Sequence, residues 1–167
     1  MKRLSLLLLL ITAVIGFSAC GFQLRGQGAE LSNTKVWLAS KDMSADFERR
    51  LQQRLAYQGA QIVESPEDSE LQLAIVNYGV ERRTVARDSL GRAAELEMIF
   101  TLEYQMLTPD KVTDQVPATQ RMTSRREFAY ERNLESGQER EQQRLIADMH
   151  EEVIGRLLLQ IAGTTGR

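Results

Sequence analysis

Apolar and polar residues alternate most regularly between residues 95 and 106, with the period of two that is typical of a β-strand. The apolar positions are Leu96, Met98, Phe100, Leu102, Tyr104 and Met106. The polar positions are Glu95, Glu97, Thr101, Glu103 and Gln105, and Ile99 is the apolar exception among them. This alternation predicts a strand with one face on a hydrophobic core and the other on polar surroundings.

A second pattern, with a period of three to four residues, predicts two amphipathic helices. The first is expected over Ser44–Gln58, with Ser44 as its N-cap. Its apolar stripe is Phe47, Leu51 and Leu55. The second is expected over Gly137–Ile161, and His150 on this helix is expected to face solvent. Its apolar stripe is Leu145, Met149, Val153, Leu157 and Ile161.

Three further segments are predicted to be strands, namely Val36–Ala39, Leu71 to about Val85, and Thr119–Tyr130. Asp88–Gly91 is predicted to be the turn of a hairpin, since Asp, Ser and Gly favour tight turns. The order strand, helix, three strands, helix predicts a single α+β domain over residues 33–163, followed by a tail over 164–167. We expect a four-stranded, mostly antiparallel sheet with both helices on one face.

The first twenty residues have the three parts of a secretion signal. Lys2 and Arg3 precede an apolar run over residues 4–15, and Ser18 and Ala19 come directly before Cys20, the only cysteine. Small residues before a cysteine resemble the bacterial lipobox, although Phe17 departs from its usual Leu. The resemblance implies that residues 1–19 are removed and that Cys20 receives a diacylglycerol on sulfur and an acyl group on its new amino terminus.

Residues 20–32 are then a lipidated tether, and several acyl chains meet the requirement for stable membrane anchoring. Gly21 stands where an aspartate would resemble an inner-membrane retention signal, so the resemblance favours the outer membrane. The alternative is a plain signal peptide that leaves Cys20 as a free thiol.

Composition and motifs argue for binding rather than catalysis. Apolar residues make up 43% and charged residues 26% of the chain, as in ordinary globular domains, and the formal net charge of −2 argues against a nucleic-acid binder. One histidine and one cysteine do not form a metal-ligand set, and no nucleophile elbow or glycine-rich phosphate loop occurs. Glu95 and Glu97 fit a solvated strand face better than an acid–base pair. We therefore expect no catalytic residue, metal or cofactor.

Arginines gather around the predicted hairpin and on the neighbouring strand. They are Arg82, Arg83, Arg87, Arg92, Arg121, Arg125 and Arg126. Guanidinium groups bind phosphates and carboxylates well because their donors form a planar fork. Arg87 and Arg92 are our candidates for binding a phosphorylated, acyl-bearing ligand. In the alternative interpretation, the arginines pair with nearby glutamates or are solvated.

The segment Cys20–Gly26, CGFQLRG, resembles the start of the mature lipoproteins of the LptE family. The order of elements, the Gly91–Glu95 entry to the alternating strand and the methionine-bearing last helix are also similar. The resemblance implies a non-enzymatic outer-membrane lipoprotein that plugs and helps assemble the LptD β-barrel. It also implies a role in lipopolysaccharide delivery to the outer leaflet, and lipopolysaccharide binding.

In this interpretation the protein is lipid-anchored on the periplasmic side of the outer membrane and extends into the lumen of the barrel. The polar face of the strand over residues 95–106 would then contact the polar interior of the barrel. Alternatives are another outer-membrane-anchored adaptor, a cell-wall-binding lipoprotein, or a lipid-tethered periplasmic enzyme.

Overall fold

The computed structural model describes residues 31–108, 117–130 and 135–165, and in the last of these stretches it describes side chains from Gln138 onward. Cys20 and the predicted signal segment lie outside these residues. In chain order the elements are β1 (Lys35–Ala39), α2 (Asp46–Tyr57), β2 (Gln61–Val63), the short 3-10 helix η1 (Pro66–Asp68), β3 (Leu71–Arg87), β4 (Ala93–Leu107), β5 (Gln120–Ala129) and α3 (Glu135–Thr165).

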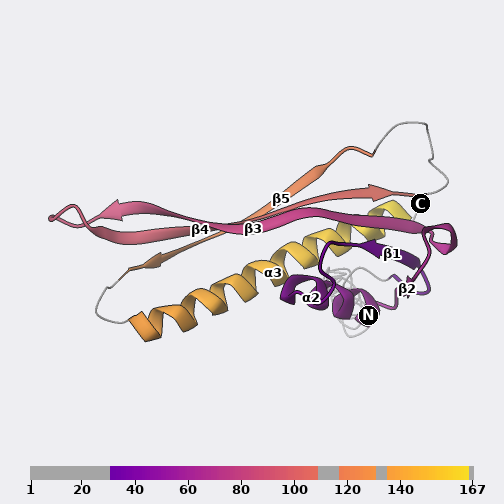
Figure 1. Ribbon diagram of the computed structural model, residues 1–167, viewed down its shortest axis with the longest axis horizontal. Helices are drawn as coiled ribbons and strands as arrows, with labels where there is room; N and C mark the ends of the chain where they lie inside the picture. The colour runs from indigo at the N-terminus through magenta and orange to yellow at the C-terminus, as the bar shows by residue number, and fades with distance from the viewer. Residues whose placement is uncertain (1–30, 109–116, 131–134, 166–167) are drawn as a thin grey trace, which may run out of the picture.

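The strands form one sheet in the order β2-β1-β3-β4-β5 (Figure 1). β1 is parallel to both β2 and β3, while the β3–β4 and β4–β5 pairs are antiparallel. Both helices lie on the same side of the sheet, with α3 running along its length (Figure 1). The predicted α+β class and the packing of both helices on one face are thus confirmed.

The predicted number of strands was wrong, because the described part of the chain has five strands rather than four and the sheet is mixed. The missed strand is β2, which has only three residues and is too short to show a period of two. It forms by pairing with β1, where Val36 lies opposite Ile62. Parallel pairing of this kind depends on a contact far along the chain, and local sequence does not reveal it.

The helix ends also differ from the prediction. α2 begins at Asp46 with Ala45 as its N-cap, and no side chain caps it. Ser44 instead donates from its backbone N–H and its hydroxyl to Asp42 Oδ1, at 2.9 and 2.6 Å, in a local turn that precedes the helix. α3 extends beyond the predicted 137–161 at both ends, through Gly163 to Thr165.

The hydrophobic core lies between the sheet and the two helices. The four central apolar residues of β4, which are Met98, Phe100, Leu102 and Tyr104, are buried as the alternation predicts. Phe47 of α2 packs against Phe100, with 5.3 Å between ring centroids, and against Tyr78 of β3 at 4.9 Å. Leu31 is also fully buried, so the core includes a residue just before position 33.

The β3–β4 hairpin extends away from β1 and β2 to one end of the molecule (Figure 1). Its turn lies over Asp88–Gly91, as predicted: Gly91 N–H donates to Asp88 O at 2.9 Å and Asp88 N–H donates to Arg92 O at 2.8 Å. Gly91 adopts a φ of 74°, a conformation that glycine reaches without steric cost. No described helix combines the length and apolar character needed to cross a bilayer.

Candidate functional site

The two arginines predicted to bind ligand lie together at the hairpin tip, and both are exposed. Arg92 Nη2 lies 2.6 Å from Asp88 Oδ2, and Arg87 Nη1 donates to Gly91 O at 2.8 Å. The hydrogen bond from Arg92 is the main reason why the pKa of Asp88 is lowered. Each guanidinium has five N–H groups, so both retain donors for an anion. Leu90, between them in the turn, is 72% exposed.

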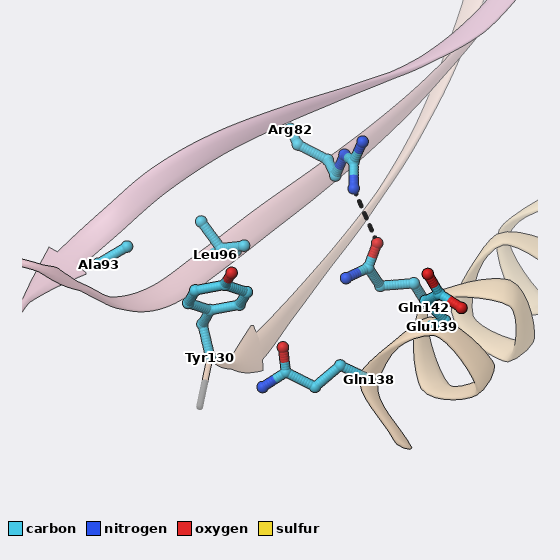
Figure 2. Close-up of a pocket in the computed structure, with 7 residues that line it drawn as sticks. All are labelled: Arg82, Ala93, Leu96, Tyr130, Gln138, Glu139 and Gln142. Atoms are coloured by element: carbon cyan, nitrogen blue, oxygen red, sulfur yellow. Dashed lines mark hydrogen bonds between the residues drawn. The ribbon is translucent and has the colours of Figure 1, made fainter. Parts of the chain in front are cut away.

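A groove of about 580 Å³ lies between the hairpin and the start of α3 (Figure 2). Its lining residues are Arg82, Ala93, Leu96, Tyr130, Gln138, Glu139 and Gln142. Arg82 Nη1 donates to Gln142 Oε1 at 2.9 Å and joins β3 to α3 across one end of the groove. Apolar side chains from β4 thus lie beside polar groups from α3, which suits an amphiphilic ligand.

The sheet face opposite the helices carries cross-strand polar pairs. Arg121 Nη2 lies 2.6 Å from Glu103 Oε1, and Arg83 Nε bonds to Glu97 Oε2. Gln105 Nε2 donates to Thr119 Oγ1 at 3.0 Å. We refer to this surface, which carries the odd-numbered side chains of β4 from Glu95 to Gln105, as the uncovered face.

Two sequence-based interpretations change on this face. Glu97 is only 5% exposed, so it is not the solvated residue that we expected, because Arg83 lies over it. The arginine clusters also follow the alternative interpretation at Arg83 and Arg121, which pair with glutamates. Glu95 remains exposed. The engagement of Glu97 by an arginine does not favour an acid–base pair with Glu95.

A polar seam joins β5 to α3 on the helix side of the sheet. Glu152 Oε2 accepts hydrogen bonds from Ser124 Oγ and Arg126 Nη2, both at 2.8 Å. The bond from Ser124 is the main cause of the lowered pKa of Glu152. This seam explains why Arg126 shares a strand face with apolar residues: its partner comes from α3.

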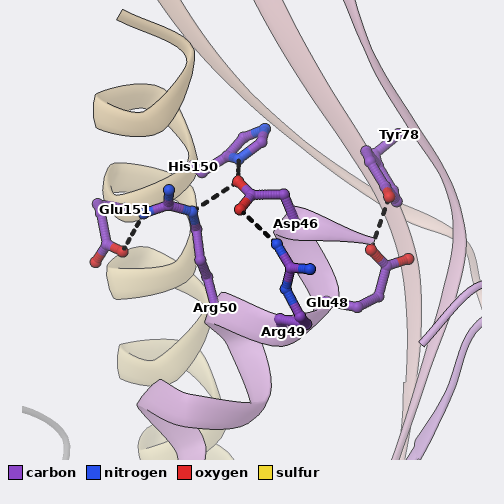
Figure 3. A network of polar contacts seen from close by, with 7 residues as sticks. All are labelled: Asp46, Glu48, Arg49, Arg50, Tyr78, His150 and Glu151. Atoms are coloured by element: carbon purple, nitrogen blue, oxygen red, sulfur yellow. Dashed lines mark hydrogen bonds and ion pairs between the residues drawn. The ribbon is translucent and has the colours of Figure 1, made fainter. Parts of the chain in front are cut away.

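Glu48, in the first turn of α2, is a buried carboxylate that the sequence did not reveal (Figure 3). It accepts hydrogen bonds from Ser40 Oγ at 2.6 Å and from Tyr78 Oη at 2.7 Å. Burial, followed by this bond to Glu48, raises the pKa of Tyr78. Glu48 thus ties the end of β1 and the start of α2 to β3.

His150 was predicted to face solvent, and this is wrong, because the residue is only 6% exposed. Its ring contacts Phe47 and Phe100 edge-on, with centroids 5.2 and 4.7 Å away. Burial lowers the pKa of His150. The spacing contained a signal for this position, since His150 lies four residues after Ile146 and four before Ile154, and residues four apart share one face of a helix.

Ligands for a metal do not converge anywhere in the described residues, where no three His, Cys, Asp or Glu side chains lie close enough to share an ion. The polar groups described above offer surfaces for hydrogen bonding and charge pairing, which are means of molecular recognition.

The solved structures that resemble this chain establish its fold. Rare lipoprotein B from Shewanella oneidensis superimposes with a TM-score of 0.70 at 23% identity, over 78% of this chain and 96% of that protein. A lipoprotein B from Nitrosomonas europaea gives a TM-score of 0.69 at 23% identity, over 87% of this chain and 93% of that one. At these identities the likeness shows a shared fold alone.

Sequence relatives and a family model show the family to which the chain belongs. An LPS-assembly lipoprotein LptE from Photorhabdus laumondii is 30% identical over 113 residues, which cover 66% of this chain and 61% of the relative. One of the same name from Yersinia enterocolitica is 32% identical over 113 residues, covering 65% and 54%. The match thus spans less than two thirds of either relative. The model of the lipopolysaccharide-assembly family LptE matches residues 33–161, and the chain belongs to that family.

Proposed function

We propose that this chain is a non-enzymatic lipoprotein that occupies the lumen of an LptD-type outer-membrane β-barrel, assists its assembly and supports lipopolysaccharide delivery to the outer leaflet. The uncovered face is the observation that carries this proposal. Large outer-membrane barrels have polar interiors, so a protein that fills one needs a hydrogen-bonding exterior around its own apolar core.

Two cross-strand ion pairs reduce the charge that the uncovered face presents. Arg83 pairs with Glu97 and Arg121 with Glu103, so these two basic side chains are neutralised locally before any partner approaches. Desolvating an isolated charge is costly, whereas paired charges and amides can exchange water for hydrogen bonds at lower cost. This face therefore suits a polar wall better than a lipid surface.

Lipopolysaccharide binding is the second part of the proposal. A phosphorylated glycolipid presents anionic groups to guanidinium forks and acyl chains to apolar surface. Arg87 and Arg92 supply the guanidinium groups, and the groove lined by Leu96 and Tyr130 supplies the apolar surface. Ala93, which follows Arg92, lines this groove, so the two features are adjacent in the fold.

Attachment to the outer membrane through Cys20 is the third part, and it predicts a specific covalent state. Mass spectrometry of protein from native membranes should find Cys20 at the mature amino terminus with diacylglycerol and an acyl group. Cys20→Ser should leave the signal segment uncleaved and the anchor missing. An unmodified thiol, or a mature chain that begins upstream of residue 20, contradicts the anchor without affecting the fold.

Affinity purification from detergent-solubilised outer membranes tests the main proposal. A large β-barrel should co-purify in near-equal amount, and depletion of the chain should reduce lipopolysaccharide on the cell surface. An adaptor or cell-wall-binding lipoprotein would bring down peptidoglycan or other partners and leave surface lipopolysaccharide unchanged. Hydrolytic turnover by the purified chain would support the tethered enzyme instead.

A further inference from the structure

β3 has an edge that no other described strand covers. β1 pairs with β3 only from Leu71 to Ala74, whereas β3 continues to Arg87. Beyond β1, the backbone of β3 pairs with β4 alone among the described strands, and every residue from Val76 to Arg87 except Tyr78 and Ala86 is exposed. A strand with one neighbour presents a row of unpaired N–H and C=O groups. Figure 1 shows this part of β3 running out toward the hairpin tip.

Side chains bond to the backbone carbonyls of β5, the strand at the other edge of the sheet, in contrast to β3. Thr123 O accepts a hydrogen bond from Arg156 Nη1 at 2.8 Å, and Arg125 O accepts one from Arg126 Nη1 at 2.7 Å. Carbonyls two residues apart point the same way from a strand, so guanidinium groups cover one series of carbonyls on β5. Within the described part of the chain, no side chain bonds to the backbone of β3 from Asn77 to Thr84.

The exposed edge also has a regular stretch suited to pairing. Register shifts occur between Ile75 and Asn77 and between Thr84 and Ala86, while from Asn77 to Thr84 each residue has a consecutive partner on β4. Bulges interrupt pairing at sheet edges, and here they bound the regular stretch rather than break it. An added strand could therefore match β3 from Asn77 to Thr84.

Side chains along this edge indicate what the added strand carries. Val80 lies within the regular stretch and is 38% exposed, and Val76 and Val85, which flank the stretch, are 37% and 42% exposed. β-Branched residues of this kind pack well against a cross-strand neighbour. The charged residues from Val76 to Arg87 are Glu81, Arg82, Arg83 and Arg87. Arg83 is paired with Glu97, and Arg82 and Arg87 against Glu81 still leave the edge basic overall. Opposite charges across a strand pair are stabilising.

We propose that the edge of β3 from Asn77 to Thr84 pairs with an extended, acidic segment of the barrel partner, which adds a strand to this sheet. The inference rests on the proposed function for the source of that segment. Main-chain hydrogen bonds would supply affinity, and the valines and arginines would set the register.

Two adjacent proline substitutions, Val80→Pro and Glu81→Pro, test the pairing in the full lipidated chain. Successive N–H groups of a strand point to opposite edges, so one proline removes a bond to β4 and the other removes only a group on the open edge. The thermal midpoint of each purified variant identifies the substitution at the open edge, because that substitution removes no bond to β4 and leaves the midpoint near that of the parent. Val80→Thr and Glu81→Gln are controls that keep the backbone N–H.

We expect the well-folded proline variant to retain about ten-fold less barrel on affinity purification, since proline prevents strand addition at that position. Both controls should retain barrel at the level of the parent. A photo-crosslinking side chain at Val80 should form an adduct with an acidic segment of the barrel, and this measurement decides alone if both proline variants unfold.

Two results overturn the inference while leaving the proposed function intact. One is barrel retention by the well-folded proline variant at the parent level. The other is a crosslink from Val80 to a second copy of this chain, or no adduct, in a preparation that contains the barrel. If the parent chain brings down no barrel at all, the proposed function and this inference fail together.

Discussion

His150 of α3 faces Asp46 of α2, with 3.6 Å between Nδ1 and Oδ2. This separation is longer than a hydrogen bond, and Nδ1 is buried without a hydrogen-bond partner among the described residues. The ring lies edge-on between Phe47 and Phe100, at the point where α2, α3 and β4 meet. The contact therefore places an ionisable group inside the packing that joins the helices to the sheet.

We predict that the fold loses stability as the pH falls below about 6.5, the ordinary pKa of histidine. Burial lowers the pKa of His150 in the folded state, so the unfolded chain binds this proton first. Asp46 and Glu151 favour the protonated form and Arg50 opposes it, but burial is the larger effect. The stabilisation is fully present above the unfolded pKa and declines toward the lower folded pKa, by at most about 1.4 kcal/mol per pH unit.

Urea unfolding between pH 7.5 and 5.5 measures this dependence. His150→Leu, which keeps an apolar side chain in the same place, should flatten the curve over that range. A slope in the His150→Leu variant equal to that of the parent would show that another group is responsible.

Glu48 gives a second prediction, which concerns a buried carboxylate with two donors. Glu48→Ala should lower the free energy of unfolding by about 2–4 kcal/mol, because it leaves the hydroxyls of Ser40 and Tyr78 without their acceptor. Tyr78→Phe should cost about 1 kcal/mol. In a double-mutant cycle by denaturant unfolding, the two changes should be non-additive by at least about 0.5 kcal/mol. Strict additivity would mean that the 2.7 Å contact contributes nothing.

The periodicity of the sequence correctly predicted the elements whose residues form a regular local pattern. A spacing of two residues predicted β4, and a spacing of four predicted the apolar stripes of both helices. The residue types of Asp88–Gly91 predicted the turn. β2 could not be predicted in this way, since three residues have no period and their pairing partner lies in β1. The ends of α2 and α3 depend in part on tertiary contacts, and local sequence placed them only approximately.

The candidate site was predicted less well than the fold. Arg87 and Arg92 were correctly placed at the hairpin, because both flank the turn in sequence. The groove was not predicted, since it forms only where Tyr130, the hairpin and the start of α3 meet. Glu48 was not identified for a related reason. An acid in a first helical turn is usually solvated, and the donors that hold Glu48 come from Ser40, just after β1, and from Tyr78 of β3.

Gly155 gives a third prediction, which uses space in the structure. This glycine is inside α3, and a Cβ built on it meets no atom within 4 Å. Gly155→Ala should raise the free energy of unfolding by about 0.5–1 kcal/mol, because alanine restricts the unfolded chain and favours helix. Gly59→Ala is the contrasting control, since Gly59 has a φ of +86° and its Cβ would lie 3.2 Å from Ser32 Cα. Gly59→Ala should destabilise, and the opposite order in thermal unfolding would contradict the packing around α3.

The hairpin arginines give the last prediction. Replacing Arg87 and Arg92 together by glutamine should weaken binding of purified lipopolysaccharide about ten-fold, because two charge-assisted contacts to its phosphates are lost. The turn should survive, because Asp88 Oδ1 still accepts from the backbone N–H groups of Leu90 and Arg92, both at 2.9 Å. The change removes two positive charges, so the control must do the same. Arg49→Gln with Arg144→Gln meets this condition at exposed positions on α2 and α3.

A loss confined to the hairpin variant would assign the phosphate contacts to the tip, whereas equal losses in both variants would indicate a general effect of charge. Raising the salt concentration sharpens the comparison, since it screens the non-specific attraction of both variants and leaves the difference due to a specific contact easier to measure. Unchanged binding in the hairpin variant would remove Arg87 and Arg92 from the site. The groove beside Leu96 and Tyr130 would then be the place to search for the ligand, because it retains Arg82 as a cation independent of the tip.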